Sequence, residues 1–234
     1  MRQAVVIGAS GGIGAALAAH LVAGGAFQTV YGFSRSAGSP PPGVTAGRID
    51  LTDEASIAAA ASRVRTAQLV IVATGALQTD RMRPERTYRA LDPESMLEAF
   101  RINTLGPALV AKHFLPLLPK DKLSVFACLS ARVGSISDNR LGGWHSYRAS
   151  KAALNMIIRT LAVELSRERP LTICVGLHPG TVETPLSQPF QRSVRPEQMF
   201  TPGVSAAHLL DVLSNLTPAD SGHVLAWDGS RVPA

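Results

Sequence analysis

Short apolar runs, rich in β-branched residues, alternate along the chain with longer stretches of helical period. A short run bounded by turn residues predicts a strand, whereas apolar positions recurring every three or four residues predict a helix. The expected strands span residues 4–7, 29–33, 68–73, 124–129 and 172–177, with a weaker one at 223–227. The expected helices span residues 12–23, 53–65, 92–118, 145–167 and 205–216.

The expected strands are apolar almost throughout, which suits a parallel sheet covered by helices on both faces. Strands that alternate with helices predict a Rossmann-type, doubly wound α/β fold of three layers, with its site at the carboxyl ends of the strands. Neither a repeat nor a linker interrupts the pattern, so residues 1–234 are expected to form a single domain. Residues 36–43 are expected to form a surface loop, and the irregular segment 185–202 is a candidate lid.

One helix start can be placed from its chemistry. Asp92 supplies an N-cap acceptor, and Pro93 follows at the first helical position, where its missing N–H costs nothing. The helix 92–118 is therefore expected to begin there.

Composition narrows the function classes. Hydrophobic residues make up 46% of the chain and charged residues 17%, which suits a globular core and argues against disorder. The net charge is +6, but the basic residues are scattered. The densest group, Arg81, Arg83, Arg86 and Arg89, lacks the interleaved aromatic residues of a single-strand binder. We therefore expect phosphate-bearing small molecules as partners, with nucleic acid only as a weak alternative, and we expect no membrane partner.

The two cysteines and six histidines show no metal-binding spacing. Cys128 and Cys174 each lie within an apolar run, so they are expected to be buried thiols, and no metal site is expected. The apolar start of the chain is interrupted by glycines, which argues against a signal peptide, and no other stretch is long enough to span a bilayer. A cytoplasmic location is the expectation.

A glycine-rich turn is the first chemical motif. The strand 4–7 runs directly into Gly8-Ala9-Ser10-Gly11-Gly12-Ile13-Gly14, which opens a helix. Glycines there allow a tight turn and the close approach of a pyrophosphate, whose charge is stabilised at the helix N-terminus. A purely structural turn gives a similar pattern, but the strand before it and the helix after it favour a dinucleotide site.

The end of the second strand indicates which dinucleotide binds. An acidic residue there would bind a ribose 2′-hydroxyl, but the chain has Ser34 and Arg35 instead. A planar guanidinium suits a 2′-phosphate, so NADP(H) is expected over NAD(H), unless Arg35 is an ordinary surface residue. Asp50 and Leu51, after a third strand, would lie near the adenine or form an exposed cap.

Tyr147 and Lys151 form the second motif. Spaced four residues apart on a helix, they share one face. A free tyrosine has a pKa near 10, and a neighbouring ammonium is expected to lower it, which would suit proton transfer to a carbonyl oxygen. This spacing is common by chance, so its weight comes from the nucleotide loop in the same chain.

With these motifs in order, the chain resembles the short-chain dehydrogenases/reductases over nearly its whole length. The segment from Ser130 to the helix of Tyr147 is similar to a subgroup related to the C-factor signalling protein and small carbonyl reductases. The resemblance implies that Asn103 holds a water near Lys151 and that Thr184 binds the nicotinamide carboxamide. The further cofactor-binding residues that it implies are Ala73, Thr74, Gly75, Pro179, Gly180 and Val182.

Two residues depart from the family pattern. Thr74 stands where the family has asparagine, and Ala131 stands where it has the catalytic serine, three residues before Gly134. Ser130 lies one residue early, and such a slip along a strand turns a side chain to the opposite face. A bulge would re-aim its hydroxyl, so Ser130 is the expected second donor, with Ser135 as the alternative.

Together these residues predict an NADP(H)-dependent oxidoreductase that interconverts a carbonyl and a secondary alcohol, with Tyr147 as general acid/base and Lys151, Ser130 and Asn103 in support. The alternative is a nucleotide-binding regulatory or signalling protein with little turnover. The resemblance also implies a homodimer or homotetramer, in which the long helices 92–118 and 145–167 would pair. The side chains of Trp144, Leu141, Phe190 and Met199 line an apolar substrate pocket or belong to the core.

Overall fold

The computed structural model describes residues 2–36, 40–188 and 199–234. Its main sheet is parallel throughout, with strand order β3-β2-β1-β4-β5-β6-β9. Its strands are β1 (Gln3–Ile7), β2 (Thr29–Ser34), β3 (Val44–Arg48), β4 (Leu69–Val72), β5 (Ser124–Leu129), β6 (Thr172–His178) and β9 (Val224–Ala226). The strand order reverses between β1 and β4, which is where a doubly wound fold places its ligand.

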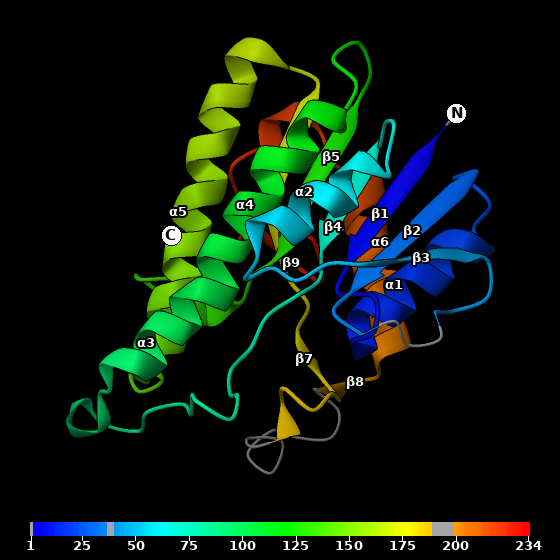
Figure 1. Cartoon of the computed structure of the whole chain (residues 1–234). Coiled ribbons are helices and arrows are strands. Elements are labelled where there is room, and N and C mark those ends of the chain that lie inside the picture. The colour runs from blue at the N-terminus through cyan, green and yellow to red at the C-terminus, as the bar shows by residue number, and fades with distance from the viewer. Residues whose placement is uncertain (1, 37–39, 189–198) are drawn as a thin grey trace.

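Helices cover both faces of this sheet, which gives the three expected layers (Figure 1). Helices α1 and α6 pack together on one face, and α2, α4 and α5 lie on the other. The α-helices are α1 (Gly12–Ala23), α2 (Glu54–Ser62), α3 (Pro93–Phe100), α4 (Gly106–Phe114), α5 (His145–Glu168) and α6 (Pro202–Ser214). The doubly wound α/β fold predicted from the hydrophobic pattern is confirmed.

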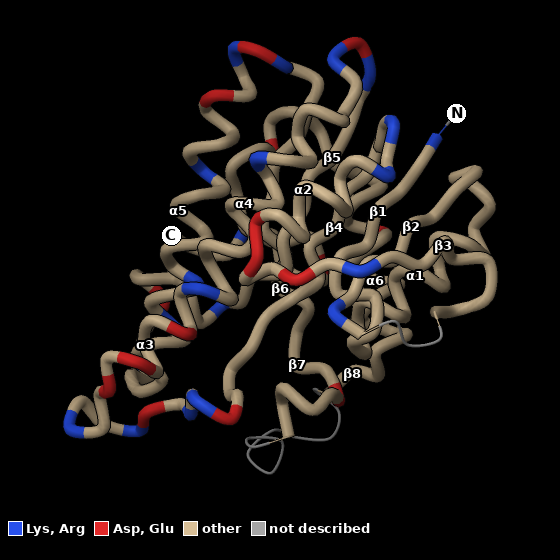
Figure 2. Tube along the Cα trace, viewed as in Figure 1, with Lys and Arg blue, Asp and Glu red and all other residues tan. Residues whose placement is uncertain are grey.

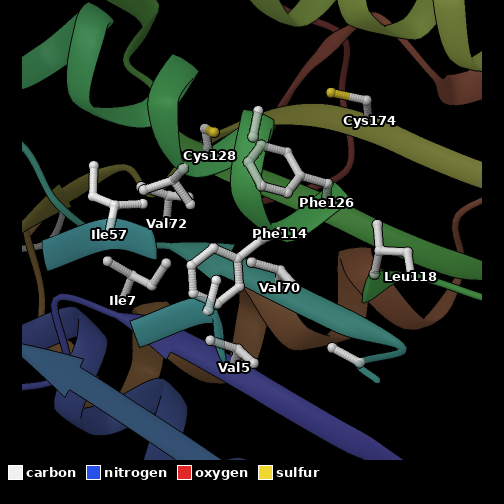
Figure 3. Close-up of a cluster of buried hydrophobic side chains, with 14 of the residues drawn as sticks. Val5, Ile7, Ile57, Val70, Val72, Phe114, Leu118, Phe126, Cys128 and Cys174 are labelled. Carbon is white, nitrogen blue, oxygen red and sulfur yellow. The ribbon is translucent and has the colours of Figure 1, made fainter. Parts of the chain in front are cut away.

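The core lies on both faces of the central strands, whose side chains are buried almost without exception. Figure 3 shows the side that faces α2, α4 and α5, where Phe114 and Phe126 pack among valines and isoleucines of β1 and β4. Cys128 and Cys174 are buried free thiols, as expected.

Two strand pairings differ from the expectation. The strand β3 lies at the edge of the sheet, and none of its residues is fully buried. It therefore has no apolar run from which its bounds could be predicted. A second sheet pairs β7 (Thr181–Val182) with β8 (Met199–Phe200), so the ends of the candidate lid segment are partly ordered. Residues 189–198 of that segment, and 37–39 of the expected loop 36–43, lie outside the described residues.

The expected helix 92–118 is divided into several pieces. It begins as expected, because the carboxylate of Asp92 accepts a hydrogen bond from Ser95 N–H at 2.7 Å. Between α3 and α4, however, residues Arg101–Leu105 form a π-helical turn, and a 3-10 turn follows α4 at Leu115–Leu117. The extra residue in a π-turn changes which side chains face inward, and here it holds Asn103 in a fully buried position.

Exposed apolar side chains lie on α3, on the π-helical turn and on α5, among them Leu97, Leu105, Met156 and Val163. Pairing of two copies across these helices stays a prediction. Across the described part of the chain, the helices are too short or too polar to cross a membrane.

Candidate active site

Two adjoining cavities open at the carboxyl ends of the central strands. One, of about 660 Å³, lies beside the ends of β2 and β3, and the other, of about 530 Å³, lies between the glycine turn, β5, β6 and α5. The two share Gly11, Arg35 and the segment Ala73–Gly75 in their walls. They therefore form one continuous groove across the point where the strand order reverses.

The glycine turn is shaped by close backbone contacts. Gly8 has φ +91° and donates its N–H to Phe33 O at 2.8 Å. A Cβ on Gly14 would lie 2.2 Å from Gly8 O, so only glycine lets α1 begin so close to β1. Gly11 precedes α1 and places no side chain over its first N–H groups, and the first turn carries no acidic residue. This helix end can therefore bind an anionic group.

The larger cavity carries charges of both signs. Arg35 lies in the walls of both cavities, and Asp50 lies in the wall of the larger one. The Asp50 carboxylate accepts hydrogen bonds from Thr52 N–H and Oγ, which lower its pKa, and the charges of Arg35 and Arg48 lower it further. Asp50 is thus an oriented, ionised acceptor, and Arg35 is an exposed cation at the groove.

Basic residues are not confined to this groove. Figure 2 shows Lys and Arg spread over the helices and loops around the molecule, whereas β1, β4, β5 and β6 carry none. In this view, basic and acidic residues of the described part of the chain lie on many of the same elements, which is the scattered arrangement expected from the sequence.

Tyr147 and Lys151 both line the smaller cavity from the first two turns of α5. The Lys151 Nζ lies 5.9 Å from the Tyr147 ring centre and donates to Leu129 O at 2.8 Å. Burial lowers the pKa of Lys151 to about 8 and raises that of Tyr147 to about 12. The expected lowering of the tyrosine pKa by lysine is thus not found in this structure, where burial raises that pKa.

Asn103 joins three parts of the site through its amide. Its Oδ1 accepts from Ala76 N–H at 2.9 Å, and its Nδ2 donates to Ala76 O at 2.9 Å. The same Nδ2 donates to Ser150 Oγ at 3.1 Å, and Ser150 Oγ donates to Tyr147 O at 2.9 Å. Asn103 therefore holds the loop after β4 against α5 and does not itself line either cavity.

Two threonines of the groove have unequal surroundings. The Thr74 Oγ1 atom is buried without a hydrogen-bond partner among the described residues. A buried hydroxyl in that state is costly, so a ligand group in the groove would stabilise it. Thr184 Oγ1 contacts Val182 O at the long distance of 3.4 Å, which leaves it readily available to a ligand.

The structure gives the Ser130 hydroxyl a hydrogen-bond partner on α5. Pairing between β5 and β6 is one-to-one from Ser124 to Leu129, and Ser130 N–H continues it to Leu177 O at 2.8 Å. The expected bulge is therefore not found at Ser130, and its Oγ donates to Asn155 Oδ1 on α5 at 2.6 Å. A hydroxyl has one hydrogen, so Ser130 can donate to a substrate only by leaving Asn155.

All the site residues predicted from sequence, apart from Asn103, line one of the two cavities. The alternative donor Ser135 does not, since its hydroxyl contacts Ala234 O and accepts from Asp138 N–H. Of the apolar pocket candidates, Trp144 lines the smaller cavity, whereas Leu141 is 91% exposed and Met199 belongs to β8. Phe190 lies outside the described residues.

Sequence reasoning missed two residues that shape the cavity wall and one that lines it. Glu85 and Arg148 hold the loop that carries Trp144. The only sequence signal for the positive φ angles in this loop is the pair of glycines before Trp144. His178 lies in the cavity wall at the end of β6, and burial lowers its pKa to about 4, so it is neutral at pH 7. No sequence signal identifies Glu85 and Arg148 as residues that shape the cavity wall, or His178 as one that lines it.

Comparison with known proteins agrees with this geometry. A model of the short chain dehydrogenase family matches residues 2–195. The C-signal protein of Myxococcus xanthus is 36% identical over 61% of this chain and 81% of its own length. The 1-hydroxy-2-glutathionyl-2-methyl-3-butene dehydrogenase of Rhodococcus sp. (strain AD45) is 32% identical over 78% of this chain and 76% of its own. The NADPH-bound carbonyl reductase from chicken fatty liver superposes over 100% of this chain and 94% of its own, with a TM-score of 0.85 and 29% identity.

The hydroxyl geometry at the end of β5 yields a paired test. Ser130→Ala is expected to lower kcat for aldehyde reduction with NADPH by less than about threefold, because that hydroxyl already serves Asn155. Ala131→Ser is expected to raise kcat at least tenfold, since an added oxyanion donor is typically worth a factor on the order of 10²–10³. Steady-state kinetics on both variants measures these changes in kcat. An unchanged NADPH affinity would show that neither substitution disturbs the cofactor site. A loss of tenfold or more in Ser130→Ala would restore the sequence-based assignment.

Proposed function

The chain belongs to the short-chain dehydrogenase family, and we propose that it is an NADP(H)-dependent reductase of a carbonyl compound, which it converts to an alcohol. The observation that carries this proposal is the placement of Tyr147 and Lys151 in the same groove as the glycine turn. A proton donor and a dinucleotide-binding turn at one cavity are what carbonyl reduction requires.

The residues present fit a bound dinucleotide. Gly11 leaves the N-terminus of α1 open to the pyrophosphate, and Arg35 would hold a 2′-phosphate. Asp50 and Leu51 would flank the adenine, while Thr74 and Thr184 would bind the nicotinamide end. The unpartnered Thr74 hydroxyl supports this assignment most directly. When bound, NADPH supplies the hydride.

Tyr147 is suited to donate the proton. Its pKa of about 12 keeps the phenol protonated throughout the neutral range, as an acid in a reduction must be. The same shift leaves little phenolate to act as a base for the reverse reaction at pH 7. The oxygen of the reduced carbonyl becomes a strongly basic alkoxide as the reaction proceeds, and the phenol protonates it there.

Lys151 returns a proton to Tyr147 after each turnover. Its amino group lies 5.9 Å from the centre of the tyrosine ring and donates to Leu129 O, and its pKa of about 8 leaves it mostly protonated at pH 7. Asn103 fixes the loop whose Gly75 approaches that amino group, where a Cβ would lie 3.3 Å from Nζ. The rate of reduction is therefore expected to fall as the pH rises through about 8.

A second function has one observation in its favour. The M. xanthus relative is named C-signal, and the Ser130 hydroxyl at the cavity wall is already engaged by Asn155. A nucleotide-binding signalling protein with little turnover would retain the groove without the second donor. NADPH binding without reduction of any aldehyde or ketone would favour that function.

The cofactor preference is tested at Arg35. NADPH is expected to bind at least tenfold more tightly than NADH, about 1.4 kcal/mol, and Arg35→Ala is expected to remove that difference. Arg48→Ala is the matched control, because Arg48 also lies close to Asp50 but lines neither cavity. Calorimetric titration with both nucleotides gives the constants. A preference that survives in Arg35→Ala would refute the assignment.

The proton donor is tested at Tyr147. Tyr147→Phe is expected to remove nearly all turnover while NADPH still binds, because only the acidic hydroxyl is lost. Tyr88→Phe serves as the control, since Tyr88 is 65% exposed and lines neither cavity. Turnover followed at the nicotinamide absorbance, with nucleotide binding measured in parallel, separates the two effects. Activity within a few-fold of the parent in Tyr147→Phe would rule the mechanism out.

A further inference from the structure

The segment that enters α5 has an unusual backbone. Gly142, Gly143 and Trp144 all have positive φ, at +62°, +65° and +51°. Trp144 is the only residue other than glycine with positive φ in the described part of the chain. A large aromatic residue rarely adopts this conformation, because its Cβ crowds the backbone. Such a cost persists where surrounding contacts impose it, and it is most frequent at ligand sites.

Glu85 supplies one set of those contacts. Its backbone carbonyl accepts the N–H of Trp144, and its carboxylate accepts hydrogen bonds from the N–H and hydroxyl of Ser146 in the first turn of α5. The side chain is only 4% exposed, so a carboxylate is buried at a helix N-terminus, where its charge is stabilised. Glu85 thereby joins the loop before α3 to the start of α5.

Arg148 supplies the second set. Its Nε donates to Gly143 O at 3.0 Å and to Gly142 O at 3.3 Å, and its NH1 donates to Val133 O at 3.3 Å. The guanidinium therefore joins the left-handed segment to the turn that follows β5. Both ends of that segment are fixed by charged side chains that take no part in proton transfer.

These contacts place the indole of Trp144 beside the proton donor. The Trp144 and Tyr147 rings are 6.4 Å apart at an interplanar angle of 73°, and both line the smaller cavity. Val133 and Leu186 add apolar surface to the same wall. A carbonyl group at the Tyr147 hydroxyl would hold its substituent next to the indole, where an aromatic ring packs more favourably than a saturated one.

We propose that Trp144 determines substrate specificity, by selecting carbonyl compounds whose carbonyl carbon carries an aromatic ring. Glu85 and Arg148 are positioning residues that hold the indole in place. The inference rests on the proposed reductase function, because it assigns a substrate class to the same groove.

Two aldehydes of similar size test the selection. Benzaldehyde has an aromatic ring and cyclohexanecarbaldehyde a saturated one. The reference is the kcat/KM for benzaldehyde divided by that for cyclohexanecarbaldehyde, measured in the parent. Trp144→Asn is expected to lower that ratio about tenfold, mainly through a higher KM for benzaldehyde. Asparagine tolerates positive φ, so the backbone of the segment is retained. Trp144→Phe keeps a ring and is expected to lower the ratio less than threefold.

The matched control is Trp227→Phe, since Trp227 packs against Phe200 and His208 and does not line this cavity. It should leave the ratio unchanged. Glu85→Ala is expected to lower the ratio, as Trp144→Asn does. Glu85→Gln keeps an oxygen acceptor for Ser146 N–H and should preserve most of the parent ratio. A ratio within twofold of the parent in Trp144→Asn would overturn the inference.

A binding measurement separates failure of the inference from failure of the function. The chain has two tryptophans, so in Trp227→Phe the emission comes from Trp144 alone. Titration of the NADP⁺ complex with benzaldehyde should change that emission saturably, and cyclohexanecarbaldehyde should not. Such a result without turnover of either aldehyde would refute the reductase function and keep the aromatic site. Equal responses to both aldehydes, or no response to either, would refute the site.

Discussion

The geometry of the site depends on the buried amide of Asn103. This side chain is fully buried, and its three hydrogen bonds hold the loop after β4 against the first turns of α5. That loop borders the cofactor end of the groove, and α5 carries Tyr147 and Lys151. An unsatisfied amide in such a place would cost about 1–3 kcal/mol, so the contacts are made together or not at all. The π-helical turn at Arg101–Leu105 is the backbone arrangement that brings Asn103 there.

Burial around this amide has a chemical consequence. Tyr147 and Lys151 are buried, and the loss of solvation moves their pKa values in opposite directions, to about 12 and about 8. The phenol is therefore held protonated, while the ammonium is close to losing its proton. The same enclosure that strengthens hydrogen bonds to a substrate oxygen thus favours proton donation over proton removal.

Much of this arrangement could be predicted from the sequence. The apolar runs located the buried strands to within a residue or two, and the glycine turn, Tyr147 and Lys151 lie in one groove as expected. The edge strand β3 escaped because it is not buried, so no apolar run marks it. The bulge expected at Ser130 is not found, and its hydroxyl bonds to Asn155 on α5, a contact that the strand pattern does not reveal.

Other features follow from contacts between distant segments, which no local pattern encodes. The π-turn at Asn103 depends on Ala76 and Ser150, and the left-handed Trp144 depends on Glu85, which lies 59 residues earlier in the chain. The direction of the tyrosine pKa shift likewise depends on burial, which the spacing of Tyr147 and Lys151 does not reveal.

The central claim is that this groove carries out hydride transfer, with a proton supplied by the chain. The most direct measurement uses NADPH deuterated on both hydrogens at nicotinamide C4 and an aromatic ketone, with the product alcohol examined by mass spectrometry and NMR. We predict one deuterium in the alcohol, bound to the former carbonyl carbon. An alcohol without deuterium, or bound NADPH with no alcohol formed, would contradict the claim.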